Sequence, residues 1–166
     1  MKKLEIGSGT YPREGYIHVD IRLLPETNVV CDARNLPFSD EIFDEVLSKH
    51  VIEHFSWRET ETILKEWVRV LKKGGKISIQ CPNIAYLCEY YSKFFKGEID
   101  KPIWFGPESD IFGGQKHEFD YHKIGFSYKT LLKKLETVGI CDISDLTVVD
   151  GQHDKQYQLH IEGIKQ

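Results

Sequence analysis

Small polar residues follow the first three apolar runs of this chain. The first run ends in Gly7-Ser8-Gly9, the second in Asp20, and the third in Asp32 and Ala33. Glycines let backbone N–H groups approach a ligand closely, and carboxylates accept hydrogen bonds from hydroxyl or amino groups. Asp20 could therefore hold both hydroxyls of a ribose, while Asp32 and the Ala33 N–H could hold an adenine edge. Together these residues indicate a nucleoside-binding site.

Histidines are the candidates for proton transfer. His50 and His54 lie one helical turn apart behind the fourth apolar run, and His117 and His122 lie in a glycine-rich segment further along. Histidine titrates close to neutral pH and can take a proton from a hydroxyl acceptor. We predict His50, His117 and His122 as catalytic candidates, and we expect His54 to have a structural role.

The elements that position these residues follow from periodicity and turn residues. Strands are expected before Gly7 and at 16–19, 27–32, 45–52 and 76–81, with closing strands at 141–149 and 156–164. Helices are expected after Ser56 and at 84–96 and 127–139. Strands that alternate with helices predict an α/β fold with a mainly parallel sheet, and the closing hairpin adds an antiparallel strand.

Capping residues set the expected limits of the first helix. Ser56 and Glu59 have the spacing of a capping box. Lys72-Lys73 suits the negative end of a helix, and we expect Gly74-Gly75 to end it in the left-handed conformation.

The segment 97–126 is rich in glycine and proline and lacks sustained periodicity. An irregular stretch of this length in a small domain is more often functional than filler. We expect a single domain over residues 1–166, with 97–126 forming an irregular loop or lid on the substrate side.

Several longer motifs resemble one enzyme family. They are LEIGSGT, HVD, CDARNLPF, FDEVLSKHVIEHF and RVLKKGGKISIQCPN, with FSYKTLLKKLETVGI nearer the end. The chain resembles the class I S-adenosylmethionine-dependent methyltransferases, and among them the small type-11 methyltransferase domain. This resemblance implies a Rossmann-like, doubly wound, seven-stranded sheet that is mainly parallel, with an antiparallel strand in the C-terminal hairpin. It also implies S-adenosyl-L-methionine as the cofactor.

The resemblance further implies which residues bind the cofactor. The expected residues are Glu5, Gly7, Ser8 and Gly9 around the methionine part, Asp20 and Ile21 at the ribose, Asp32 and Ala33 at the adenine, and Lys49 and His50 below the sulfonium.

The bridge between the first two strands departs from the family pattern. Only residues 10–16 follow Gly9 before the strand that bears Asp20, so we expect no helix between these strands. A dinucleotide site would need a third glycine where Pro12 stands, and a helix to hold the pyrophosphate. S-adenosylmethionine has no phosphate, so the bridge favours it over NAD. The sheet face left bare would need another cover, from the 97–126 segment or from a second subunit in a homodimer.

The sequence specifies the acceptor less well than the donor. No N-P-P-Y or D-P-P-Y motif follows the fourth strand, which argues against methylation of nucleobase amino groups. We expect a small-molecule or sugar acceptor that is methylated on oxygen. A non-catalytic module that binds S-adenosylmethionine is the alternative. Aminopropyl transfer is disfavoured because Ser48-Lys49-His50 stands where that chemistry needs an acidic pair.

Composition limits the partners and the location. The net charge of −4 argues against nucleic acid as the main partner. No apolar run approaches the ~20 residues of a membrane span, and the N-terminus has no signal-peptide pattern. Four cysteines, Cys31, Cys81, Cys88 and Cys141, lack C-x-x-C spacing. We expect free thiols in a cytoplasmic protein and no metal site.

Overall fold

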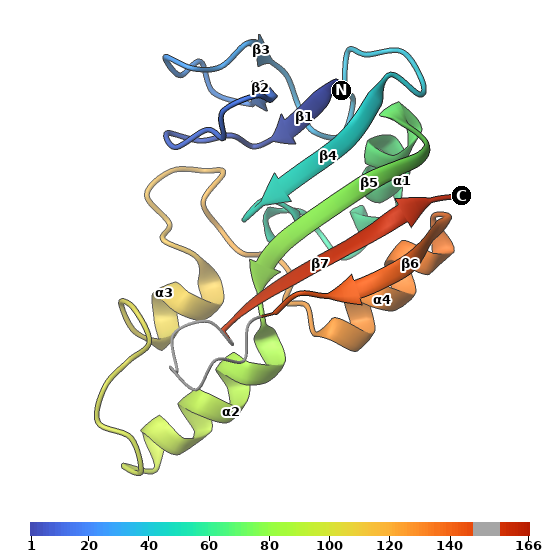
Figure 1. Ribbon diagram of the computed structural model, residues 1–166. Helices are drawn as coiled ribbons and strands as arrows, with labels where there is room; N and C mark the ends of the chain where they lie inside the picture. The colour runs from blue at the N-terminus through green and yellow to red at the C-terminus, as the bar shows by residue number, and fades with distance from the viewer. Residues whose placement is uncertain (148–156) are drawn as a thin grey trace.

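The computed structural model describes residues 1–147 and 157–166, and within them the strands form one sheet (Figure 1). The strands are β1 Lys3–Ile6, β2 Ile17–Asp20, β3 Val29–Val30, β4 Phe43–Lys49, β5 Leu71–Pro82, β6 Ile140–Asp145 and β7 Gln158–Lys165. Their order is β3-β2-β1-β4-β5-β7-β6, with β7 antiparallel to both of its neighbours and the other pairs parallel. This confirms the predicted seven-stranded, Rossmann-like sheet with an antiparallel closing hairpin.

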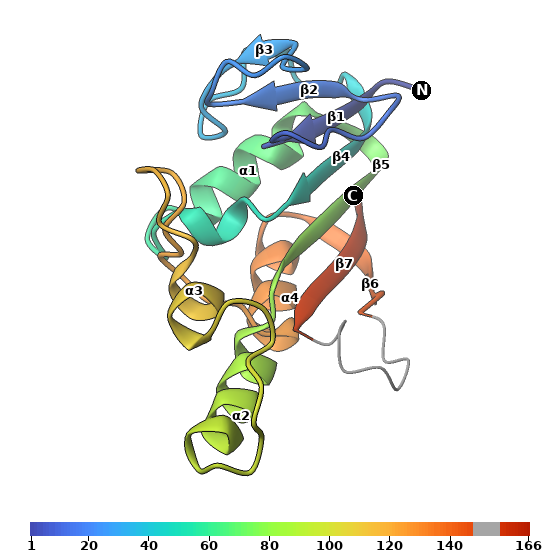
Figure 2. The same ribbon diagram turned by 90° about the vertical axis from the view of Figure 1, so that its left-hand side faces the viewer.

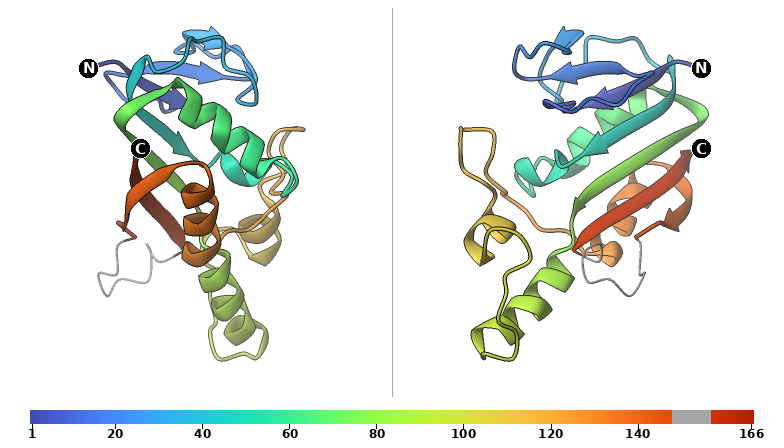
Figure 3. Two further views of the ribbon diagram at one scale, coloured as in Figure 1. Left: turned by 90° about the vertical axis from the view of Figure 1, so that its right-hand side faces the viewer. Right: turned by 60° about the vertical axis from the view of Figure 1, so that its left-hand side comes forward.

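The helices lie on one face of the sheet and at its carboxyl edge. Helices α1 (Thr60–Val70) and α4 (Tyr128–Thr137) pack on the same side, as the left panel of Figure 3 shows. Helices α2 (Ile84–Phe95) and α3 (Pro107–Phe112) lie beyond the end of β5, and a 3-10 turn, η1, covers Ile52–His54 (Figure 2). The strand order is that of a doubly wound sheet, but the face turned toward the viewer in Figure 1 carries no described helix.

The core lies between the sheet and helices α1 and α4. Every second residue of the central strands is fully buried on this side, including Leu4, Ile6, Val46, Ile77 and Ile79. The helices contribute Trp67, Leu64, Leu131 and Leu135, which are also fully buried. These side chains form one continuous cluster, which fixes the strands whose ends carry the candidate site.

The opposite face of the sheet is polar. Glu45 on β4 accepts a hydrogen bond from the Tyr16 hydroxyl at 2.7 Å and pairs with Lys3 at 2.9 Å and Lys76 at 3.2 Å. Lys76 also pairs with Glu162 on β7 at 3.1 Å. Parallel sheets usually bury both faces, whereas alternating polar and apolar residues suit a sheet with one solvated face. The ion pairs therefore explain how this face of the sheet can be stable without a helix packed on it. A homodimer that covers the face stays a prediction.

Glu45 gives a pH-dependent prediction. Burial acts to raise its pKa, but bonds from Tyr16, Lys3 and Lys76 outweigh burial and hold it below the ordinary value of 4.5. The stability that this carboxylate provides is fully present above pH 4.5 and is lost as the pH falls through the lowered pKa. Glu45→Gln should therefore lower the free energy of unfolding by roughly 1–3 kcal/mol at neutral pH. In urea unfolding experiments, the difference in the free energy of unfolding between Glu45→Gln and the wild type should shrink as the pH falls below 4.5.

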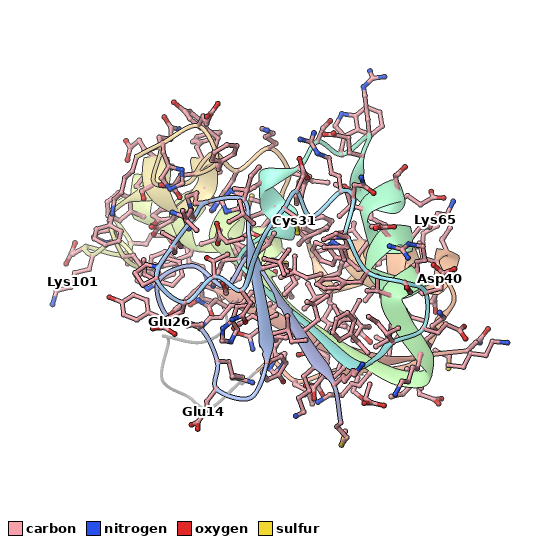
Figure 4. All side chains as sticks on the ribbon, turned by 90° about the horizontal axis from the view of Figure 1, so that it is seen from above. Glu14, Glu26, Cys31, Asp40, Lys65 and Lys101 are labelled. Atoms are coloured by element: carbon pink, nitrogen blue, oxygen red, sulfur yellow. The ribbon has the colours of Figure 1, made fainter. Side chains whose placement is uncertain are left out.

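Glu61→Gln is the matched control for this experiment. Its carboxylate pairs with Lys65 on the exposed side of α1, where the labelled lysine lies in Figure 4. Solvent screens an exposed pair of this kind, so its removal should change the stability little. Equal losses in the two variants would show that the Glu45 network does not stabilise the bare face.

Two expected boundaries need correction. Helix α1 ends at Val70 rather than at Gly74-Gly75, because Leu71 is already extended and pairs with Phe43 as the first residue of β5. Gly74 does have a positive φ of 71°, but it lies in the irregular stretch where the register of β4 and β5 shifts. At the other end, Glu59 accepts the Ser56 N–H as expected, yet Ser56 Oγ accepts from Arg58 and the helix starts at Thr60.

The remaining elements agree with the prediction except in detail. No helix stands between β1 and β2, as expected. Helix α4 has Ser127 as N-cap, with Thr130 completing a capping box. The 97–126 segment contains the short helix α3, which its lack of periodicity did not predict. The residues between the two expected closing strands, 150–155, lie outside the described residues. Within the described ranges, no helix is both long and apolar enough to cross a membrane.

Candidate functional site

The ends of four strands open into one cavity of about 1230 Å³. The loops after β1, β2, β3 and β4 form one side, and the 97–126 segment forms the other. Residues 112–122 of that segment rise toward the β1 and β2 ends in Figure 1, and we call 97–126 the lid. All of the predicted cofactor and catalytic residues line this cavity. Its volume exceeds the ~300–1,000 Å³ typical of a site for one small ligand, so it has room for a donor and an acceptor.

The glycine loop after β1 is tightly packed on one side and open on the other. Gly7 has a φ of 68°, its N–H donates to the Val19 carbonyl at 2.8 Å, and a Cβ on it would overlap Cγ2 of Val51. Gly9 has a φ of 59°, but a Cβ there would meet nothing within 4 Å. Ser8 Oγ is buried and has no hydrogen-bond partner among the described residues. The loop thus leaves space and a free polar atom for a ligand.

Glu5 lies beside this loop but is already engaged. Its Oε2 accepts the Arg13 N–H at 2.7 Å and lies 3.6 Å from His18 Nε2. This contact holds the 10–16 bridge against β1 and β2. The labelled Glu14 of the bridge points outward in Figure 4, away from the sheet.

Asp20 ends β2 as a buried acceptor. Its carboxylate accepts the Gly9 N–H at 3.0 Å and the Arg22 N–H and Nε–H at 2.9 and 3.1 Å. Burial acts to raise the pKa of Asp20, but the bonds from Arg22 and Gly9 outweigh it and keep the pKa below its usual value. The side chain is therefore ionised near neutral pH and joins the glycine loop to the β2 end.

Asp32 follows β3 and faces the same cavity. Arg34 holds its carboxylate in several hydrogen bonds, the shortest at 2.6 Å, and thereby lowers the pKa of Asp32. The neighbouring Ala33 carbonyl accepts a bond from the buried Trp67 indole at 3.0 Å. Trp67 thus connects the core of α1 to the segment that bears the acid.

His50 has a strained backbone at the end of β4. Its φ is 54°, a left-handed value that is uncommon for residues other than glycine. The His50 N–H donates to the Gln80 carbonyl at 2.8 Å, and its Nδ1 lies 3.1 Å from Glu53 Oε1. With the proton on Nδ1, Nε2 is left as a free acceptor. Strain of this kind tends to collect at functional sites.

Glu53 is a site residue that the sequence prediction missed. Its side chain is 1% exposed, and its Oε2 has no hydrogen-bond partner among the described residues. One ligand atom each from Glu53, His54 and His122 lie within 4.8 Å of one another. The spacing H-x-x-E-H at residues 50–54 was the available signal, because it puts both histidines near one acid.

The three predicted catalytic histidines do not come together. His50 and His122 gather around Glu53, and burial lowers the pKa of His122. His117 lies at the other end of the cavity, where its Nε2 is 3.1 Å from Arg22 Nη1 beside the β2 acid. His117 therefore closes the lid over the β2 end rather than joining His50.

A buried acid anchors the lid. Asp110 of α3 is 2% exposed and accepts the Tyr91 hydroxyl of α2 together with the N–H groups of Trp104 and Phe105 at 3.2 and 3.3 Å. Burial and the Asp110 charge raise the pKa of Tyr91, so its hydroxyl stays a donor. The anchor fixes the aromatic part of the lid over the cavity.

Tyr91→Phe should loosen the lid. The change leaves Asp110 buried with one donor fewer, which costs about 1–3 kcal/mol. Hydrogen exchange should become faster over residues 103–112. Tyr90→Phe is the control, because the Tyr90 hydroxyl donates to Lys101 at an exposed site. Similar exchange in the two variants would rule out the Asp110 anchor.

Comparison with known proteins places the fold. A family model described as a methyltransferase domain matches residues 5–79, which run from the second half of β1 through β2, β3 and β4 and into β5. Residues 5–79 therefore match the methyltransferase-domain family, and the fold of the described residues is that of the class I S-adenosylmethionine-dependent methyltransferases. S-adenosylmethionine is the methyl donor of this family.

Individual relatives match this chain to different extents. The probable tRNA methyltransferase 9B of Mus musculus is 48% identical over 52 residues, which is 31% of this chain but only 12% of the relative. A possible histamine N-methyltransferase of Thermotoga maritima has a TM-score of 0.62 and 21% identity, over 99% of this chain and 82% of that one. The 1,6-didemethyltoxoflavin-N1-methyltransferase of Burkholderia thailandensis, solved with its namesake compound and S-adenosylhomocysteine, has a TM-score of 0.63 and 16% identity, over 98% and 70%. At these identities the solved structures show the fold alone.

Proposed function

We propose that this methyltransferase transfers a methyl group from S-adenosylmethionine to a hydroxyl of a small molecule or sugar. One observation carries the proposal. The cavity that holds the glycine loop and the acids of β2 and β3 continues past His50 to the lid. A donor and an acceptor could therefore lie side by side with the reacting atoms near His50.

The donor half of the cavity fits the cofactor. Ser8 Oγ is a buried polar atom without a partner among the described residues, and the space at Gly9 lets a ligand approach the loop backbone. In this proposal the loop holds the methionine part, Asp20 accepts the ribose hydroxyls, and Asp32 with the Ala33 N–H holds the adenine. Bound S-adenosylmethionine supplies a methyl group activated by its positive sulfur, and S-adenosylhomocysteine is left when the C–S bond breaks.

His50 is the proposed general base. Its Nδ1 is held by Glu53, so Nε2 can accept the hydroxyl proton while the acceptor oxygen forms the new bond to the methyl carbon. The fixed position of His50 at a strained strand end supplies alignment, which is the main contribution a protein makes to such a displacement.

The lid supports a small-molecule or sugar acceptor. Trp104, Phe105 and Phe119 line the cavity and are 41%, 86% and 40% exposed. Exposed aromatic rings at a cavity offer apolar contact area for a ring-shaped ligand. The relative named as a tRNA methyltransferase matches less than a third of this chain, so RNA is not the proposed acceptor.

All four cysteines are free thiols, which supports the expected cytoplasmic location.

A non-catalytic module is the second candidate. Such a module would need the donor half of the cavity alone. The lid anchor at Asp110 and the aromatic lining favour an enzyme, because both lie on the acceptor side.

A methyl-transfer assay tests the proposed reaction. The chain is incubated with S-adenosylmethionine and with separate sets of sugars, hydroxylated aromatics, amines and tRNA, and S-adenosylhomocysteine is measured. We expect turnover with the hydroxylated sets and its loss in His50→Gln. Turnover with amines or tRNA alone would overturn the acceptor class, and no turnover in any set would favour the module.

A further inference from the structure

A side-chain cluster on the acceptor side has the composition of a metal site. Glu53 and His54 come from η1, and His122 comes from the lid, so two segments far apart in sequence meet there. The geometry points to a binding site for a divalent transition-metal ion formed by Glu53, His54 and His122. This differs from the expectation of no metal site that the cysteine spacing gave.

The buried carboxylate is the first argument for this site. Glu53 is 1% exposed, its Oε1 is used by His50, and its Oε2 has no hydrogen-bond partner among the described residues. An unpaired polar atom inside a protein is costly, and a buried carboxylate usually has a partner or a metal ion. A cation bound beside Glu53 Oε2 would be a partner for this atom, which has none among the described residues.

The orientation of the two histidines is the second argument. His54 Nδ1 lies 3.1 Å from the Tyr121 carbonyl, and the His54 and His122 rings lie together with centroids 5.2 Å apart. With the Nδ1 proton of His54 donated to this carbonyl, Nε2 of His54 is left as an acceptor for a ligand. Metal-binding histidines are typically held in this way, because the second-shell bond fixes the tautomer and the ring orientation.

The spacing is close to that of bound ligands. The three ligand atoms lie within 4.8 Å of one another. In a tetrahedral site with bonds of about 2.1 Å, the ligand atoms lie ~3.4 Å from one another. A side-chain movement of about an ångström would therefore bring the three ligand atoms to the spacing of a bound set.

The ligand set selects the class of ion. Two imidazoles and one carboxylate suit Zn²⁺, Co²⁺ or Mn²⁺, whereas Mg²⁺ and Ca²⁺ prefer oxygen ligands. Three protein ligands leave at least one position open, as in catalytic sites. His54 and His122 both line the cavity, so the open position would face the acceptor.

A role for the ion follows if the proposed function holds. A metal ion in this place would act as a Lewis acid and bind the hydroxyl oxygen of the acceptor, which is the atom that takes the methyl group. The hydroxyl would be positioned beside His50, which contacts the same Glu53. The proton would pass to His50 and the oxygen would take the methyl group, as in the proposed reaction.

Cobalt binding to the intact chain tests the site without an activity assay. The protein is stripped with a chelator, dialysed, and titrated with Co²⁺ while its visible absorption is recorded. We expect saturation at one ion per chain, and competition by Zn²⁺. Glu53→Gln and His122→Asn should each weaken binding by at least about tenfold, on the scale seen for perturbed metal sites. His160→Asn is the control, since His160 contacts Ser78 on the polar sheet face.

Two results would overturn the metal site. The first is a wild type that gives no saturable Co²⁺ signal. The second is a His122→Asn variant that binds Co²⁺ as tightly as the wild type. Either result would mean that Glu53 only orients His50. If Glu53→Gln fails to fold by circular dichroism, His122→Asn decides, because its residue lies on the lid. S-adenosylhomocysteine binding is measured on the same samples. Binding of S-adenosylhomocysteine without binding of Co²⁺ overturns the metal site alone. A wild type that does not bind S-adenosylhomocysteine overturns the proposed function.

Discussion

Asp20→Ala is expected to weaken the binding of S-adenosylhomocysteine by about tenfold or more, because hydrogen bonds to a charged group contribute roughly 1.5–3 kcal/mol. The acid is 5% exposed, ionised, and adjacent to the glycine loop through its bond from Gly9. Removing it takes away the proposed ribose acceptor and the contact that ties the loop to β2. Isothermal titration of the intact chain measures the change.

Asp44→Ala is the matched control for this prediction. Asp44 also accepts a backbone N–H, from Lys2, and pairs with Lys72 at 2.7 Å, but it lies at the opposite end of the strands. Its removal should leave the affinity unchanged. If Asp20→Ala binds as tightly as Asp44→Ala does, Asp20 has a structural role only.

Gly7→Ala should cause the largest loss of stability. The residue has a φ of 68°, and a Cβ would overlap the Val51 side chain. Left-handed backbone costs an alanine about 1–2 kcal/mol, and overpacking adds about 1–3 kcal/mol. The free energy of unfolding in urea should therefore fall by roughly 2–5 kcal/mol.

Two further variants separate the clash from the backbone strain. Gly74→Ala carries the strain alone, because Gly74 has a φ of 71° and a Cβ there meets nothing within 4 Å. Val51→Ala in the Gly7→Ala background should restore part of the stability by removing the overlap. A loss in Gly7→Ala no larger than that in Gly74→Ala would contradict the tight packing of the loop on Val51.

The gathering of the predicted donor-side residues at one cavity could be inferred from sequence because the signals are local, while their binding of the donor stays a prediction. Each of Gly9, Asp20 and Asp32 follows a short apolar run, and the ends of parallel strands meet at one edge. The short bridge before Tyr16 likewise left room for no helix, and none is there. Knowledge of the neighbouring strands was not needed for these inferences.

The polar sheet face was present in the sequence but was not recognised. The stretches Lys3–Ile6 and 76–81 alternate polar and apolar residues, which is typical of a strand with one side in water. The expectation that a second subunit or the 97–126 segment must cover the sheet came from the missing helix between the first two strands and took no account of this alternation. The ion pairs around Glu45 show how this face can contact water, and a second subunit over it stays a prediction.

Other features depend on contacts between distant residues. The end of α1 at Val70 follows from the pairing of Leu71 with Phe43, which no local capping signal reveals. The cluster of Glu53 with His122 forms because the Glu53 carbonyl accepts the Lys123 N–H at 2.8 Å and draws this part of the lid against η1. Periodicity in the lid gave no indication of that contact.

The central claim is that the cavity at the carboxyl ends of the strands binds the methyl donor. Isothermal titration of the intact wild-type chain with S-adenosylhomocysteine tests it most directly. We predict saturable binding with one molecule per chain. An absence of binding heat at millimolar ligand, with the protein folded by circular dichroism, would contradict it.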